Sequence, residues 1–505
     1  MENSTYTLTD LDNRRHKYPN YSAEIEAIRN GGITEKLLNR IIRKHRPNAK
    51  HSMELMERYM ASEDGVPIFK RQPRFGDGDE VINNKLNNDF FSEINDFKTG
   101  YFAGNPIAYA YANTDEALDD TGDEGDSESE EQAARDAASK ALTDFVTRNN
   151  MFKVDMESTK QAAIGGYAGR LFYVDTKGEP RVMNTPTNES IILSETRDMT
   201  HPTYGVRYFK TTDINDKTLW KAEFYDESMI YFFEGSYNKL KLVGQKPHLF
   251  DMCPLQGIPN NEEMQGDAEK VLSLIDAFDR ALSDTNNELE SFANAYMIFK
   301  NLSMTDEEKR EAQVAGSIEF HSNGVEDADV YFLTKDINDA FIEHHLDRLE
   351  NNIHRFSKTP NLSDESFGTA SGVSLKFKIL GLETKCGMFE AQMISAGNYM
   401  FELLAGVFSK RQIKFDPLQC TMSFKRNFPL DLVSEAQAAQ AMKGAGLPDQ
   451  VAYEMAFSGI DDIDYVMQLK EKERDNMPGL MDDMPGDNDD EQEKPVKKKG
   501  DANDD

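Results

Sequence analysis

The fold is decided by residues 266–300, which read GDAEKVLSLIDAFDRALSDTNNELESFANAYMIFK. Apolar side chains recur in this stretch in alternating steps of four and three residues, as they do on one face of a helix. The pattern predicts one helix of about 30 residues, which is ~45–50 Å long at 1.5 Å per residue. Asp267 lies near its start, where a carboxylate suits the helix dipole. The other faces are expected to show acids to solvent, at Asp276, Asp279, Asp284, Glu288 and Glu290.

Two further helical patterns follow along the chain. Residues 336–357 carry a second apolar stripe, and a third long helix is expected over residues 373–409. The segment between them, residues 358–371, cannot continue either helix because proline and glycine interrupt it. Residues 301–335 form a short α/β insert with two expected strands, SIEFH and DVYFL. The resulting order is long helix, insert, second helix, breaker-rich loop and third helix.

The front part of the chain mixes helices and strands. Helices are expected within residues 22–60 and 83–102, and Gly165–Gly169 is expected to turn a helix into a strand. Residues 171–243 contain short runs of aromatic and β-branched residues separated by turn signals, which is typical of a sheet. Trp220 is expected in the core of that sheet.

Two acidic segments have the composition of disordered chain. Residues 114–131, TDEALDDTGDEGDSESEE, contain ten acids and no base, so we expect a disordered surface loop there. A calcium site is the weaker reading, because the loop lacks the glutamate expected at its twelfth position. Residues 476–505 are dominated by Asp, Glu, Gly, Pro and Lys and are expected to form a disordered tail.

Charge and composition exclude several classes of protein. The 505 residues include 57 Lys and Arg against 90 Asp and Glu, a formal charge of −33, which argues against tight non-specific nucleic-acid binding. The basic residues Arg40, Arg43, Lys44, His45 and Arg46 are interpreted as a solvated helix face, and the alternative is a patch that contacts nucleic acid. The first ten residues do not resemble a signal peptide, and no apolar run approaches the ~20 residues that a membrane span needs. The three cysteines are too scattered for a disulfide framework and are expected to be buried or free thiols.

No motif points to catalysis. The chain contains no GxxxxGK[ST] loop, no GxSxG elbow and no HExxH pair. His344, His345 and His354 lack a supporting ligand at metal-site spacing, so they are interpreted as part of a solvated helix face. We expect a protein that is not an enzyme and that needs no cofactor and no metal.

The joint order and spacing of four stretches resembles the portal proteins of tailed bacteriophages with Gram-positive hosts. The stretches are YFAGNP (101–106), GGYAGRLFYVD (165–175), residues 258–297 and residues 334–383. The resemblance covers most of residues 20–475. It implies an α+β subunit of a ring, usually of twelve copies, that forms a channel for packaging and ejection of double-stranded DNA. The alternative is another non-enzymatic head–tail structural protein, although head-completion adaptors are usually far shorter and lack the paired helices.

The resemblance also implies a division of the chain and a set of partners. Its parts would be a β-rich wing (1–265, including the acidic loop 114–131), stem helices (266–300 and 336–357), a clip (301–335), a tunnel loop (358–371), a long wing helix with following strands (372–429), a crown (430–475) and the tail (476–505). Its partners would be other copies of the chain, DNA as the translocated load, the terminase large subunit, a head–tail adaptor, and capsid and scaffolding proteins, but no membrane. Assembly would occur in the host cytoplasm and the final place would be one vertex of the virion. The implied DNA-channel residues are Lys358, Thr359, Pro360, Asn361, Ser363, Asp364, Gly368, Ser371, Lys376 and Lys378.

Overall fold

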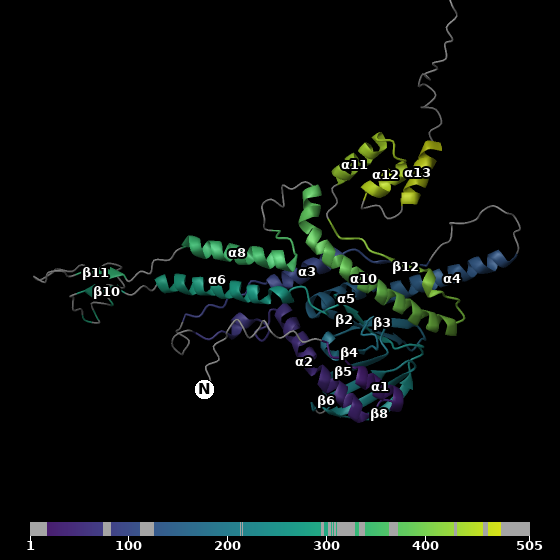
Figure 1. Cartoon of the computed structure of the whole chain (residues 1–505), viewed down its shortest axis with the longest axis horizontal. Coiled ribbons are helices and arrows are strands. Elements are labelled where there is room, and N and C mark those ends of the chain that lie inside the picture. Colours follow the sequence, from purple (N-terminus) through teal and green to yellow (C-terminus); the bar gives the residue numbers. More distant parts are fainter. Residues whose placement is uncertain are drawn as a thin grey trace, which may run out of the picture. The chain divides into compact units, whose positions relative to one another are not determined.

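The structure, a computed structural model, divides into two compact units, Met1–Asn427 and Phe428–Asp505, which are described separately. The fold mixes helices and antiparallel sheets, as the α+β prediction requires (Figure 1). The described residues are 18–73, 82–111, 126–212, 214, 216–293, 297–300, 305, 307, 310, 329–332, 339–362, 372–428, 432–457 and 463–475.

A five-stranded antiparallel sheet forms one layer of the first unit. Its strands, in spatial and chain order, are β4 (Ser190–Leu193), β5 (Tyr204–Thr212), β6 (Thr218–Tyr225), β7 (Met229–Ser236) and β8 (Lys239–Pro247). Helices α1 (Ser22–Gly31) and α2 (Glu35–Tyr59) pack their apolar faces on it. Trp220 is only half-buried and stacks at 6.2 Å on Tyr208, so it lies at the rim of the predicted core. The predicted strands are confirmed.

A three-stranded sheet lies next in the chain and is entered through a glycine turn. Its antiparallel order is β3 (Pro180–Thr185), β2 (Tyr167–Val174) and β9 (Leu255–Pro259). Helix α5 (Met151–Gly165) ends at Gly166, whose φ of 85° is left-handed, and β2 begins at the next residue. Because L side chains rarely adopt such a φ, the predicted helix-to-strand turn by glycine is confirmed.

Part of the acidic segment is helical. Helix α4 (Asp126–Asn149) begins inside the stretch that composition predicted to be disordered, so that prediction is wrong for residues 126–131. Acidic residues in a first helical turn interact favourably with the helix dipole. This interaction offsets the small number of apolar side chains in the segment. Residues 114–125 lie outside the described part of the chain.

Helix α10 and a small sheet close the first unit. Helix α10 (Gly372–Lys410) follows its prediction closely, and its stripe residues Leu382, Cys386, Phe389 and Met393 are fully buried. Strand β1 (Ala108–Tyr111) pairs antiparallel with β12 (Cys420–Ser423), which joins segments about 300 residues apart. One apolar cluster unites α4, α5, α10 and this strand pair.

A helical hairpin extends from this body. Helix α6 (Leu272–Ala293) leads out to strand β10 (Met297–Lys300), which pairs antiparallel with β11 (Asp329–Phe332), and α8 (Asp339–Ser357) returns alongside α6 (Figure 1). The predicted helix to residue 300 is therefore wrong over 297–300, where an aromatic and β-branched run finds a strand partner. Near the body the apolar stripes meet at Ile275, Phe278 and Ile353, against α3 (Phe90–Ala103). The N-terminal part of the 83–102 prediction is also wrong, because Asp89 caps α3 and starts it there.

Four 3-10 turns and three short helices complete the elements in the described part of the chain. The turns are η2 (Pro67–Lys70), η3 (Thr187–Glu189), η4 (Glu269–Val271) and, before β12, η5 (Pro417–Gln419), of which η4 leads directly into α6. The described part of the second unit contains α11 (Leu432–Gly444), α12 (Asp449–Ala456) and α13 (Ile463–Asp475). Asp449 forms ion pairs with Lys443 (3.1 Å) and with Lys470, and these two pairs join the three helices.

Candidate functional site

Helix α8 ends in a tight turn at the beginning of the predicted tunnel loop. Lys358 has a left-handed φ of 59°, which stops the helix. The backbone N–H of Thr359 donates to the carbonyl of His354 at 3.1 Å, and Asn361 Nδ2 donates to Glu350 Oε1 at 2.9 Å. The chain therefore leaves α8 in a defined direction before residue 363.

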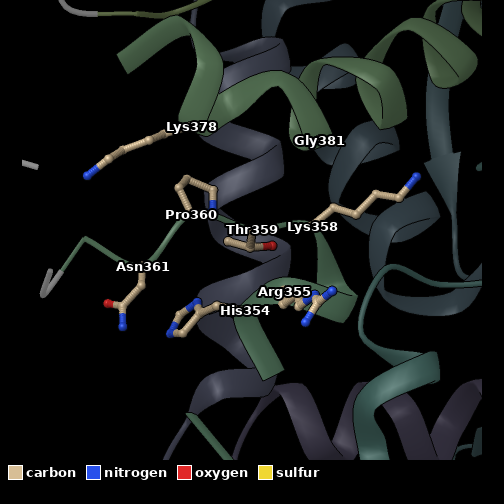
Figure 2. Close-up of a pocket in the computed structure, with 8 residues that line it drawn as sticks. All are labelled: His354, Arg355, Lys358, Thr359, Pro360, Asn361, Lys378 and Gly381. Atoms are coloured by element: carbon tan, nitrogen blue, oxygen red, sulfur yellow. The ribbon is translucent and has the colours of Figure 1, made fainter. Parts of the chain in front are cut away.

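The turn and α10 line an open cavity of about 320 Å³ (Figure 2). Five of the ten predicted site residues line it, namely Lys358, Thr359, Pro360, Asn361 and Lys378. The other lining residues are His354, Arg355 and Gly381, and a Cβ added at Gly381 would lie 3.3 Å from Lys358 Cβ. Lys376 is exposed on α10 and does not line the cavity. Ser363, Asp364, Gly368 and Ser371 lie outside the described residues.

Sequence reasoning missed two of the lining side chains. His354 was interpreted as part of a solvated helix face, but it is buried, with its ring 5.8 Å from that of Phe90. That interpretation is wrong because α8 packs this face on α3. Arg355 was not singled out at all, and its only sequence signal is its position two residues before the helix ends. His344 and His345 are exposed, as expected.

A buried cluster of charged side chains connects the base of the α6–α8 hairpin to α3 and α10, next to this cavity. Asp267 lies 2.9 Å from the ammonium of Lys98 on α3 and 2.7 Å from that of Lys385 on α10. Lys385 also donates to the carbonyl of Ser357 at 2.8 Å, and Lys98 donates to Asn260. These contacts connect α3, α8, α10 and the segment before α6. A second cavity of about 70 Å³ adjoins the cluster and shares Lys358 with the first.

The charges in this cluster depend on one another. Burial alone would raise the pKa of Asp267, but the two ammonium groups outweigh it and hold that pKa below its ordinary value. Burial lowers the pKa of Lys385, against the attraction of Asp267. Asp267 had been assigned to the helix dipole from its position alone. Its carboxylate instead neutralises buried lysines, a role that no local pattern indicates.

The acids of α6 are largely engaged within the chain rather than shown to solvent. Asp276 and Asp279 are buried, so the prediction of an acidic outer face is wrong for these two residues. Asp279 Oδ1 accepts from the backbone N–H of Asn88 at 2.8 Å and from its side chain at 3.0 Å. The partners are Arg58 for Asp276, Asn88 for Asp279 and Arg71 for Asp284. These acids attach α6 to Arg58, Arg71 and Asn88.

Asp279 gives this attachment a pH dependence that can be measured. Burial raises its pKa to about 6, although the hydrogen bonds from Asn88 oppose the rise. Since the folded-state pKa lies above the unfolded one, the folded state holds the extra proton between about pH 4 and 6, and stability falls as pH rises through that window. We expect Asp279→Asn to remove this loss. The free energy of unfolding of the variant minus that of wild type should therefore be about 1 kcal/mol larger at pH 8 than at pH 5.

The measurement is urea unfolding of both proteins at the two pH values. Asp251→Asn serves as the control, because Asp251 is exposed and pairs with Lys410 at the surface. An equal pH response for Asp279→Asn and wild type would show that Asp279 is not the titrating group.

Two cations of the basic segment of α2 are paired with a carboxylate. Arg40 Nε and Lys44 Nζ pair with the buried carboxylate of Glu24 at 3.0 and 2.9 Å. His45 is fully buried and hydrogen-bonds the hydroxyls of Tyr208 (3.0 Å) and Tyr167 (3.3 Å), so its assignment to a solvated face is wrong. Burial lowers its pKa to about 3, which leaves it neutral.

The described residues offer no metal centre. Among them, no three His, Cys, Asp or Glu side chains are placed to hold a metal ion. The three cysteines are buried and free, as expected, and burial raises the pKa of each to about 12, so they are poor nucleophiles at neutral pH. No helix within the described ranges is long and apolar enough to cross a membrane.

The chain is similar to known proteins along most of its length. The model of the family "Phage portal protein, SPP1 Gp6-like" matches residues 38–478. The portal protein of Bacillus phage SPP1 is 22% identical over 422 residues, 77% of this chain and 76% of that protein. The portal protein of Clostridium phage phiCD119 is 27% identical over 148 residues, 29% of this chain and 33% of that protein. Because the family match spans well over half of the sequence, the chain belongs to the SPP1 Gp6-like family of phage portal proteins.

Proposed function

We propose that this portal protein works as a closed ring of twelve copies at one vertex of the capsid. Double-stranded DNA would pass through the ring during packaging and ejection. The observation that carries the proposal is the family match over residues 38–478, together with a helical hairpin followed by a turn and a 39-residue helix. Identical subunits that contact one another through different surfaces form closed rings when their rotation closes.

The hairpin and α10 offer apolar surface for such contacts. Leu289 on α6, Phe341 on α8 and Phe377 on α10 are 59%, 68% and 72% exposed. Apolar side chains that are this exposed are removed from water when a subunit interface covers them, which favours association. We propose that neighbouring subunits cover them in the ring.

The parts of the subunit are proposed to act as in the family. The α6–α8 hairpin would be the stem, residues 301–335 the clip, and residues 358–371 the tunnel loop that meets DNA. The cations in and near this loop would be Lys358, Lys376 and Lys378. The body would be the wing and α11 to α13 the crown. The terminase large subunit, a head–tail adaptor, and capsid and scaffolding proteins would bind in turn, with assembly in the host cytoplasm. The family is a structural one, and we propose that the chain is not an enzyme.

The proposal predicts that the protein assembles into rings and that these rings bind free DNA weakly. At 57.3 kDa per chain, a ring of twelve has a mass of about 690 kDa and a formal charge of about −400. We expect light scattering to find that mass and negative-stain images to show a central hole. With so few free cations to release counterions, a short duplex should bind more weakly than the ~10⁻⁴–10⁻⁶ M of non-specific DNA-binding proteins. Fluorescence anisotropy across a salt series measures this affinity.

Two results would contradict the proposal. Only monomers or dimers at micromolar concentration in several buffers would rule out the ring. Submicromolar duplex binding with a steep salt dependence would indicate a DNA-binding protein, despite the pairing of Arg40 and Lys44 with Glu24.

A further inference from the structure

The end of α8 is attached to α10 by a lysine side chain. Lys385 Nζ donates to the backbone carbonyl of Ser357, the last residue of α8, at 2.8 Å. The last carbonyls of a helix have no partner within the helix, and a lysine ammonium can satisfy them. Gly381 lies one turn earlier on the same face of α10, and a Cβ added there would be 3.3 Å from that of Lys358 (Figure 2). This face of α10 therefore holds the end of α8 and the first residue after it.

The positive charge of Lys385 exceeds what the buried cluster needs. The carboxylate of Asp267 is already matched by the ammonium of Lys98, which lies 2.9 Å away in a side chain only 1% exposed. Lys385 adds a second ammonium 2.7 Å from the same carboxylate, and its side chain is 12% exposed. Two ammonium groups against one carboxylate leave one excess positive charge in a buried place. Such a charge lowers the stability of the folded state.

The titration of Lys385 agrees with this cost. Burial lowers the pKa of Lys385 although Asp267 attracts the charged form. A lysine whose pKa is lower in the folded state than in the unfolded state reduces stability at neutral pH. Stabilisation of the cluster therefore does not explain a lysine at this position. The hydrogen bond to Ser357 is the contact that Lys98 and Asp267 do not already supply.

We infer that Lys385 is a positioning residue that fixes the start of the tunnel loop, residues 358–362, on α10 for DNA translocation. The carbonyl that it holds immediately precedes Lys358, where the left-handed φ turns the chain out of α8. A contact that fixes this carbonyl also fixes the direction in which the next residues leave. Through Asp267 the same ammonium is joined to the segment that leads into α6. The role in translocation rests on the proposed function, whereas the positioning of residues 358–362 does not.

The first experiment compares the full-length wild type with Lys385→Met, which keeps most of the side-chain length and removes the charge and the donors. Hydrogen exchange, measured by mass spectrometry on peptides that cover residues 354–362, should be faster in the variant by about tenfold or more, because Ser357 loses its anchor. The midpoint of urea unfolding should stay at the wild-type value or rise, because the excess buried charge is gone. A purely structural role would instead lower the midpoint.

Lys98→Met is the matched control, because it removes the other ammonium of the cluster and leaves Asp267 paired with Lys385. The partners of Lys98 are Asn260, Asp267 and the ring of Phe389, which lie outside α8. Exchange in the same peptides should therefore remain at the wild-type rate. Equal acceleration in both variants would mean that the charge of the cluster, and not the contact with α8, controls the loop.

A second control keeps the comparison valid if Lys98→Met does not fold. Lys410 makes the same two kinds of contact at the exposed end of α10, with the carbonyl of Leu249 at 2.7 Å and with Asp251 at 2.8 Å. Lys410→Met should fold and leave the exchange of residues 354–362 unchanged. The DNA packaged per ring is then measured for both variants, and Lys385→Met should package about a tenth as much as Lys410→Met or less.

The outcomes separate this inference from the ring. Wild-type exchange in Lys385→Met, or a urea midpoint lowered as far as that of Asp267→Ala, overturns the positioning even if the same sample shows rings. Faster exchange with wild-type packaging per ring overturns the role in translocation. If the wild type forms no rings, the proposed function fails, while the exchange rates still decide whether Lys385 positions residues 358–362.

Discussion

Replacing Asp267 with alanine is expected to destabilise the first unit by about 3–5 kcal/mol, the range found when one partner of a buried ion pair is removed. The substitution leaves two ammonium groups, of Lys98 and Lys385, close together without a counter-charge. Lys98 is almost completely buried and Lys385 nearly so. Urea unfolding of wild type and variant at pH 7 measures the difference.

The same variant has a distinctive pH response. Without the carboxylate, nothing opposes the burial and the repulsion from Lys98 that lower the pKa of Lys385 in the folded state. A depressed lysine pKa means that the folded state binds fewer protons than the unfolded state, so stability rises with pH. The deficit of Asp267→Ala should therefore be smaller at pH 9.5 than at pH 7, by an amount that we place at roughly 1 kcal/mol. A deficit independent of pH would mean that lost packing, and not unpaired charge, is the cause.

The matched control is Asp251→Ala, which breaks the 2.8 Å ion pair with Lys410. Both partners of that pair are exposed, and exposed pairs contribute about 0–1 kcal/mol. A loss of several kcal/mol in both variants would show that carboxylate removal is harmful at any position and would remove the special role of Asp267.

Replacing Gly166 with alanine is expected to destabilise the protein by about 2–4 kcal/mol, because two separate effects oppose the new side chain. Its φ of 85° is left-handed, a conformation that an L residue adopts at a cost of ~1 kcal/mol or more. The added Cβ would also overlap the carbonyl oxygen of Met264, which is backbone and cannot rotate away. Thermal melting and urea unfolding both measure the loss.

Gly100→Ala is the control for this change. Gly100 lies inside α3, and an added Cβ there meets no atom within 4 Å. Alanine is favoured over glycine in a helix interior by ~1 kcal/mol, so this variant should be as stable as wild type or more stable. If Gly166→Ala behaved like Gly100→Ala, the turn would have to be more deformable than its geometry indicates.

The most reliable predictions rested on long periodic patterns in the sequence. The stripe of α10 is buried from Leu382 to Met393 because an uninterrupted repeat of three and four places those residues on one face whatever packs against it. The glycine turn at Gly166 was predictable for a similar reason, since few residues tolerate its backbone angles. In both cases, interactions between residues within a few tens of positions along the chain determine the local structure.

Features that depend on distant partners were not predictable from local pattern. Asp276 reads as a solvent-exposed acid of a helix, and only Arg58, 218 residues away, makes its burial favourable. His45 reads as a basic residue until the two tyrosine hydroxyls that enclose it are known. The candidate site contains both kinds of feature. The loop was predicted from its helix breakers, whereas His354 and Arg355 line the cavity only because of how α8 packs.

The pairing of β1 with β12 has a consequence for synthesis of the chain. Residues 108–111 have no strand partner until residues 420–423 have emerged from the ribosome, and the same is true of the apolar surface that α10 covers. Contacts of such long sequence separation form late and leave apolar surface exposed in the meantime. We expect nascent subunits to remain monomeric and dependent on chaperones until translation has passed residue 423, so that only finished chains enter assembly.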